Sequence, residues 1–267
     1  MQNPEIVVIK HILREHIKIS LCSVLLSLNI KPLVIDVIPL NRIEDQTGLL
    51  YVSAIALKIA PFSPQPNENI AQILQSYLIQ DFPLKLNEIR INPPGWIYFD
   101  LHQQVMENWL DQWVKFYKSA DIYSDIVTDT EAKQSPNYNQ IDSDMIWKIQ
   151  YIYARCCSLL RLAQTQGLIT KDTWIENIDW LKLVHPAEKS LFAQLSGMVD
   201  SYPNILQSQW SQLDQTFADF YSQCRIFGAV MTENPILAQS RLGLLVATIS
   251  VLKFLLQNLP FSLFSSI

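Results

Sequence analysis

The spacing of hydrophobic residues divides the chain into two parts with different patterns. In the first part, apolar residues recur at helical spacing over residues 5–29, and a β-branched run over residues 33–38 predicts a strand. A compact apolar stretch over residues 49–60 predicts a helix, and Asn67 is the expected cap of the next one. This mixture of periods is typical of an α+β unit.

Two further strands are expected on either side of a Pro-Pro-Gly turn. They cover residues 84–91 and 96–101, and a helix over residues 103–117 closes the unit. Successive side chains of a strand point to opposite faces, so the second strand presents two different sets of residues. One face carries Ile97, Phe99 and Leu101, and the other carries Trp96, Tyr98 and Asp100. We therefore expect an outer face that is aromatic and polar.

The last part of the chain predicts helices alone. Apolar positions step by three or four residues over 146–160, 191–202 and 206–224. A final helix over 237–257 is apolar nearly all round, which places it at the centre of a bundle. The expected fold is therefore an α+β N-terminal domain joined to an all-α helical bundle.

A polar segment separates the two parts. Residues 119–145 contain a Ser-Pro-Asn sequence, several Asp and few large apolar side chains, and they show no helical period. This composition predicts a linker. The expected domains are residues 1–118 and 146–267, joined by an acidic linker over 119–145.

The negative charge of the chain is concentrated in that linker. The chain has 20 Lys and Arg against 25 Asp and Glu, a net charge of −5. Residues 119–145 hold one Lys and six acidic residues, whereas residues 1–118 and 146–267 carry net charges of −1 and +1. The two folded parts are nearly neutral, so neither shows the basic excess of a strong electrostatic binder of nucleic acid.

The cysteines and the apolar stretches both favour a cytoplasmic protein. The four cysteines form no C-x-x-C pair, and the adjacent Cys156 and Cys157 are poorly placed for a disulfide. Residues 19–30 are too short to span a membrane, and no small-residue cleavage site follows them. Residues 242–252 are followed by Lys253 and fit a buried core helix, so we expect no membrane partner.

No constellation of catalytic or metal-binding residues emerges. The four histidines have no Cys or carboxylate nearby at ligand spacing, so no metal site is expected. The phosphate-binding patterns G-x-x-x-x-G-K-[ST] and G-x-G-x-x-G are absent, as are H-x-G-H and G-x-S-x-G. The sequence therefore predicts that the protein binds a partner without metal, ATP or other cofactor, and that it is not an enzyme.

Four stretches of the helical part resemble one family. They are Gln-Tyr-Ile-Tyr-Ala-Arg at 150–155, Pro-Ala-Glu-Lys-Ser-Leu at 186–191, Phe-Ala-Asp-Phe-Tyr-Ser-Gln-Cys-Arg-Ile at 217–226, and Arg-Leu-Gly-Leu at 241–244. The DALR anticodon-binding domain of class I arginyl-tRNA synthetases has, in this order, Q-Y-A-H-A-R, E-x-x-L, F-x-x-F-Y-x-x-C-x-V and R-L-x-L. The helical part therefore resembles that domain. It departs from the pattern at Tyr153, where the family has His, and it ends without the family's P-x-M.

The first part resembles the N-terminal additional domain of the same synthetases. Residues 50–60 are similar to its alanine-rich helix, and residues 94–99 are similar to its P-G-F-I-x-F strand. In that family the strand faces the outer corner of the tRNA, near the D-loop. The resemblance thus implies that Asn92, Trp96 and Tyr98 contact tRNA, with an aromatic ring stacked on a base. The alternative is that Trp96 packs under a neighbouring helix.

The resemblance also implies contacts on the anticodon side of tRNA. The candidates match family positions and are Tyr151, Arg155, Arg161, Arg225 and Arg241. Each arginine could equally tie helices together or cap carbonyl groups. Because the family's anticodon recognition depends on the terminal region where P-x-M is missing, the resemblance does not imply specificity for arginine tRNA.

In the synthetases, a Rossmann-type catalytic domain with the H-x-G-H signature and a lysine signal loop lies between these two modules. Here residues 119–145 take its place. The resemblance therefore implies a non-catalytic arginyl-tRNA synthetase paralogue that binds tRNA. The alternatives are a protein–protein interaction or regulatory module that kept the fold and lost RNA binding, and an accessory subunit of a catalytic complex.

Overall fold

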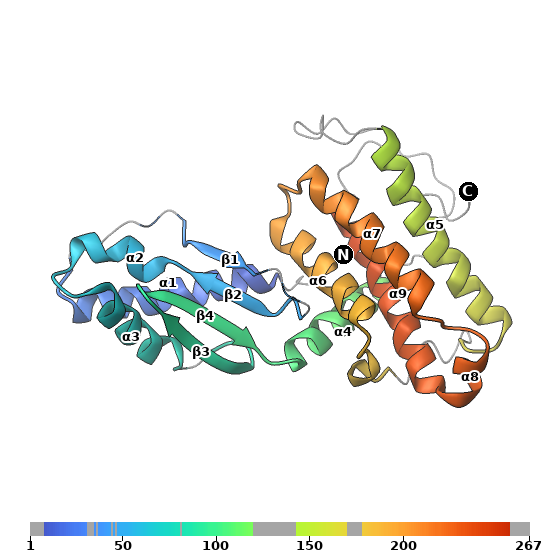
Figure 1. Ribbon diagram of the computed structural model, residues 1–267, viewed down its shortest axis with the longest axis horizontal. Helices are drawn as coiled ribbons and strands as arrows, with labels where there is room; N and C mark the ends of the chain where they lie inside the picture. The colour runs from blue at the N-terminus through green and yellow to red at the C-terminus, as the bar shows by residue number, and fades with distance from the viewer. Residues whose placement is uncertain are drawn as a thin grey trace. The chain divides into compact units, whose positions relative to one another are not determined.

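The chain forms two compact units that divide between Met106 and Glu107. They are seen in a computed structural model (Figure 1). The structure describes residues 8–30, 35, 37–43, 45, 47–80, 82–119, 143–169 and 178–256. The first unit mixes helices with a small antiparallel sheet, and the second is helical, as the hydrophobic periods predict.

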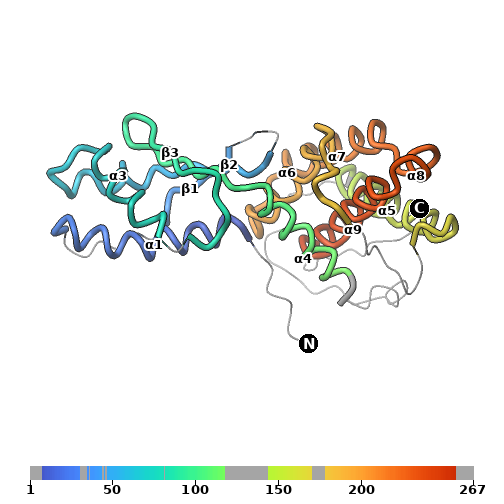
Figure 2. The backbone as a smooth tube through the Cα atoms, turned by 90° about the horizontal axis from the view of Figure 1, so that it is seen from below, coloured from blue at the N-terminus to red at the C-terminus, as the bar shows by residue number. Residues whose placement is uncertain are grey.

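The first unit is a four-stranded antiparallel sheet with the strand order β1-β2-β4-β3. Helices α1 and α3 pack on one of its faces (Figures 1 and 2). Strand β4 alternates as predicted, because Ile97, Phe99 and Leu101 are buried while the residues between them are not. The elements are α1 (Ile9–Ser27), β1 (Leu40–Arg42), β2 (Leu50–Ser53), α2 (Ile55–Ile59), the 3₁₀ turn η1 (Ala60–Phe62), α3 (Asn67–Leu78), β3 (Leu86–Asn92) and β4 (Trp96–Leu101).

Three local predictions in this unit differ from the structure. The helix predicted over residues 49–60 is instead a strand, β2, followed by the short helix α2. Tyr51 pairs with Phe99 of β4, and the Ser53 hydroxyl accepts a hydrogen bond from the Ile55 amide at 3.2 Å, so a new helix begins there. Asn67 is the first residue of α3 and makes no side-chain cap. Half of the strand predicted over 33–38 lies outside the described residues, and the observed strand begins at Leu40.

The second unit is a helical bundle built around α9. This helix is buried on nearly every side, as its apolar sequence predicts. Among the described residues, α9 alone has the length and apolarity of a membrane span, but 78% of that stretch is buried inside the bundle, which marks a core helix. The elements are α4 (Gln104–Ser119), α5 (Ser143–Thr165), the 3₁₀ turn η2 (Trp180–Lys182), α6 (Pro186–Ser201), α7 (Gln207–Gln223), α8 (Ala229–Glu233) and α9 (Pro235–Leu256).

Helix α4 packs in the second unit, not in the first. The ring of Trp109 lies 5.4 Å from that of Phe192 on α6, and Asp111 accepts a hydrogen bond of 2.7 Å from the Trp180 indole. The domain boundary predicted at residue 118 is therefore wrong, and it falls instead at the start of this helix. Of the predicted linker, residues 120–142 lie outside the described residues, and α5 already begins at Ser143.

Replacing Trp109 tests the assignment of α4 to the bundle. Trp109 is buried, so Trp109→Ala should lower the free energy of unfolding by about 3–5 kcal/mol through the cavity that it leaves. Within the described part of the chain its indole nitrogen has no hydrogen-bond partner, so Trp109→Phe should cost less than about 1.5 kcal/mol. Urea unfolding followed by circular dichroism measures both. Equal stability of Trp109→Ala and the wild type would contradict the packing of α4.

Candidate nucleic-acid interface

The outer face of the sheet carries the residues predicted for the D-loop side. In the β3–β4 hairpin, Asn92 lies opposite Trp96, and Arg90 lies opposite Tyr98. The Arg90 guanidinium lies 5.9 Å from the centre of the Tyr98 ring and pairs with Glu88 at 2.8 Å. Trp96 is 37% exposed, so it lies at the surface rather than under a helix. The structure therefore brings the three predicted residues together on one exposed face.

A glycine fixes the turn that places Trp96. Gly95 has φ +133°, a conformation that residues with a side chain rarely adopt. A Cβ atom at this position would also lie 3.1 Å from the Asn67 carbonyl oxygen at the start of α3. The turn therefore packs closely against α3, and this contact positions Asn92 and Trp96 at the two ends of the hairpin turn.

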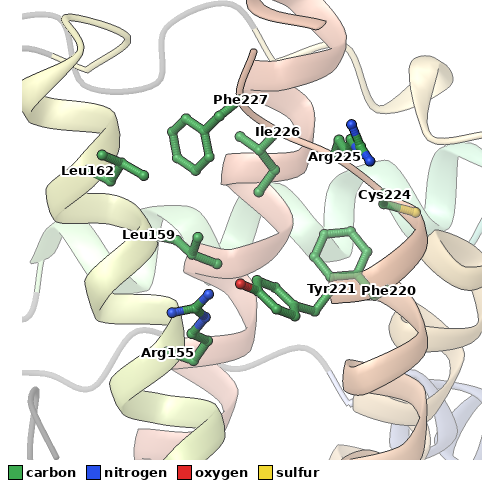
Figure 3. Close-up of a pocket in the computed structure, with 9 residues that line it drawn as sticks. All are labelled: Arg155, Leu159, Leu162, Phe220, Tyr221, Cys224, Arg225, Ile226 and Phe227. Atoms are coloured by element: carbon green, nitrogen blue, oxygen red, sulfur yellow. The ribbon is translucent and has the colours of Figure 1, made fainter. Parts of the chain in front are cut away.

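The helical unit contains a pocket of about 300 Å³ beside α5 and the end of α7 (Figure 3). The guanidinium of Arg155 lies 4.5 Å from the centre of the Tyr221 ring, and the two side chains form one wall. The Nε atom of Arg155 is buried and has no hydrogen-bond partner within the described residues. Arg225 lies at the opposite end of the pocket from Arg155 (Figure 3). The remaining lining residues are Leu159, Leu162, Phe220, Cys224, Ile226 and Phe227.

Arg241 does not line this pocket, because its side chain is buried and pairs with Glu188 of α6. Its Nε donates to the Glu188 carboxylate at 2.6 Å, and its NH1 group donates to the backbone carbonyl of Arg225. The other oxygen of Glu188 accepts the backbone N–H of His185 at 2.9 Å and so caps α6. Of the roles predicted for Arg241, the structure shows two, because the side chain ties helices together and binds a backbone carbonyl. Through its hydrogen bond to the Arg225 carbonyl, Arg241 fixes the backbone at the residue that lines the pocket.

The remaining candidates lie on α5. Tyr151 is 52% exposed, and Arg161 is also exposed and donates a hydrogen bond of 3.1 Å to the Ser158 hydroxyl. Sequence reasoning missed Tyr221 and Phe227 as parts of the pocket. Tyr221 follows a run of buried aromatic residues on α7, and only a precise helical phase could have shown that its ring faces outward.

The cysteine beside the pocket is suited to packing rather than to catalysis. Cys224 is buried, and its Sγ lies 3.5 Å from Nδ1 of His185. Burial raises the pKa of the Cys224 thiol to about 11; the nearby Glu188 raises it too, while Arg241 opposes the shift. The thiol therefore stays protonated at neutral pH and is a poor nucleophile. Within the described residues, no three His, Cys, Asp or Glu side chains are placed to hold a metal ion.

Thiol labelling tests this part of the site. At neutral pH, iodoacetamide should modify the exposed Cys22 in the folded protein and leave Cys224 and the buried Cys156 unmodified, as read by mass spectrometry. A denatured sample, in which all cysteines react, is the control. The pKa of the Cys224 thiol rises from 9.0 in the unfolded chain to about 11 in the folded one, so the thiol ionises more easily in the unfolded chain. Its ionisation should therefore lower the stability of the fold only above about pH 9. Rapid modification of Cys224 in the folded protein would contradict its burial.

Comparison with known proteins matches the second unit to one family. Residues 149–264 match the DALR anticodon binding domain. The arginine–tRNA ligase of Gloeobacter violaceus is 30% identical over 51% of this chain and 24% of its own length. The enzymes of Synechococcus sp. and Chloroflexus aurantiacus are each 27% identical, over 53% and 50% of this chain and 24% of their own lengths. No solved structure matches the chain.

These matches cover only part of this chain and only part of its relatives. The chain spans about a quarter of the length of the curated relatives that it matches. The family match begins within α5, so the resemblance of the first unit to a synthetase N-terminal domain stays a prediction. Over residues 149–264 this chain thus matches the DALR anticodon binding domain, and it is similar to arginine–tRNA ligases over about half of its length.

Proposed function

We propose that this chain binds tRNA through both of its units and does not itself attach an amino acid. The observation that carries this proposal is the pocket between Arg155, Tyr221 and Arg225, which lies in the domain matched to an anticodon-binding family. The short match to the ligases supports the absence of catalysis, as does the lack of H-x-G-H in the sequence. We place the protein in the cytoplasm, where tRNA is used and cysteines stay reduced.

The chemistry of the pocket suits a single unpaired base. Its volume of about 300 Å³ is at the small end of the range for ligand sites. Its walls are mostly apolar and can hold the faces of a planar ring, while Arg155 presents a buried N–H that has no partner within the described residues. A base with an acceptor on its edge would satisfy that donor. An anticodon loop presents such unpaired bases.

The outer face of the sheet is the second proposed contact. Trp96 and Tyr98 offer aromatic rings, and Asn92 and Arg90 offer hydrogen-bond donors on the paired strand. A base stacked on an aromatic ring contributes about 1–3 kcal/mol. Both units are nearly neutral in sequence, so each site alone should bind weakly, and their presence on one chain would add avidity.

Binding to total tRNA across a salt series tests the proposal as a whole. We expect saturable filter binding at low salt, with a logarithm of the affinity that falls as the logarithm of the salt concentration rises. We also expect no arginine-dependent exchange between ATP and pyrophosphate. If no tRNA binds at low salt, a module that binds a protein partner becomes the better account. A clear exchange signal would overturn the non-catalytic assignment.

A charge-matched pair of variants tests the pocket. Arg155→Ala should weaken tRNA binding about tenfold, because it removes a charge, a donor and the partner of the Tyr221 ring. Lys182→Ala removes one exposed charge in η2 that does not line the pocket, and it should weaken binding about twofold at most. Tyr221→Ala combined with Arg155→Ala should cost less than the sum of the two, since the side chains are in contact. Equal losses for Arg155→Ala and Lys182→Ala would show that the pocket contributes only charge.

A further inference from the structure

Helix α5 exposes two aromatic rings before it reaches the pocket. Trp147 is 66% exposed and Tyr151 is 52% exposed, and they lie one helical turn apart. Arg155 follows one turn later at the same spacing, so the three side chains lie on one face of the helix. That face leads directly to the pocket, which Arg155 lines.

Helix α7 runs beside this face in the same direction as α5. The ammonium of Lys148 lies 4.0 Å from the Asp214 carboxylate, and seven residues later in both helices Arg155 contacts Tyr221. By this register, the exposed Ala218 of α7 lies beside the turn that carries Tyr151. A side chain as small as that of alanine leaves the ring of Tyr151 accessible from the α7 side.

The charges around the aromatic rings favour contact with bases rather than with phosphates. Lys148, which lies between Trp147 and Tyr151 in the sequence, pairs with Asp144 at 3.2 Å as well as with Asp214. Its charge is therefore offset by two carboxylates, and the two arginines lie further along, at the pocket. An aromatic face with little net charge that continues into a cationic pocket fits single-stranded RNA, whose unstacked bases lie on aromatic rings.

We propose that Trp147 and Tyr151 extend the pocket into a track for consecutive unpaired nucleotides. This proposal rests on the proposed function, since it assumes that the pocket takes an RNA base. One base lies in the pocket, and its neighbours along the strand lie on the rings of Tyr151 and Trp147. Rings one turn apart are separated by about 6 Å along the helix axis, more than the 3.4 Å between stacked bases, so the track selects bases that are no longer stacked on each other.

Two RNA probes and three variants of the full chain test the track. The probes are a hairpin with an open anticodon-type loop and a fully paired duplex of the same length. Trp147→Ala should weaken hairpin binding about tenfold, which corresponds to about 1.4 kcal/mol and lies within the range for base stacking. Trp147→Phe should restore most of the affinity, and Val184→Ala, which trims another exposed apolar side chain, should change nothing. Duplex binding and the salt dependence should stay unchanged in all three variants.

The outcomes separate the track from the proposed function. If the wild-type protein binds the hairpin and Trp147→Ala binds it equally well, the track is wrong and the pocket stands. If the wild-type protein binds neither tRNA nor the hairpin, both proposals fail. If Trp147→Ala leaves RNA affinity unchanged but abolishes a concentration-dependent self-association in sedimentation, the face is a protein contact and the RNA track is overturned.

Discussion

The pocket depends on one buried ion pair, between Arg241 of α9 and Glu188 of α6. A charge removed from water is costly unless it is paired, and here each partner also binds backbone: Glu188 caps α6, and Arg241 holds the carbonyl of Arg225. The core helix, the start of α6 and the wall of the pocket are thus joined at one point. The position of Arg225 at the pocket therefore depends on an interaction between two residues that do not line the pocket.

Tryptophan serves two opposite purposes in this chain. Trp109 and Trp180 join α4 and η2 to the bundle, whereas Trp96 and Trp147 stay at the surface. An indole in a core stabilises through its large apolar area, and at a surface the same area is available to a ligand. The exposed rings lie where the proposal places tRNA, beside the Gly95 turn and on the approach to the pocket.

Both proposed contacts combine aromatic rings with few unpaired charges. On the sheet, Arg90 is paired with Glu88, and on α5, Lys148 lies between two carboxylates. This arrangement is consistent with the near-neutral charge of both parts of the sequence. Under the proposed function, binding would therefore depend on the shape and stacking of unpaired bases more than on attraction to phosphates, and it would be less sensitive to salt than in a basic RNA-binding protein.

Hydrophobic periodicity alone determined the two-part fold, the long helices of the bundle, the central place of α9 and the two faces of β4. Those features follow from the local spacing of apolar residues, which is the same whichever neighbouring element covers them. Tertiary structure decided what the spacing left open. It made a strand of Leu50–Ser53 by pairing it with β4, it took α4 into the bundle, and it buried Arg241 while leaving Arg155 and Arg225 at the pocket. An apolar stripe indicates that one face of a helix is buried, but it does not show which surface covers that face. The covering surface, and the arginine that pairs with a carboxylate, depend on residues distant in the chain.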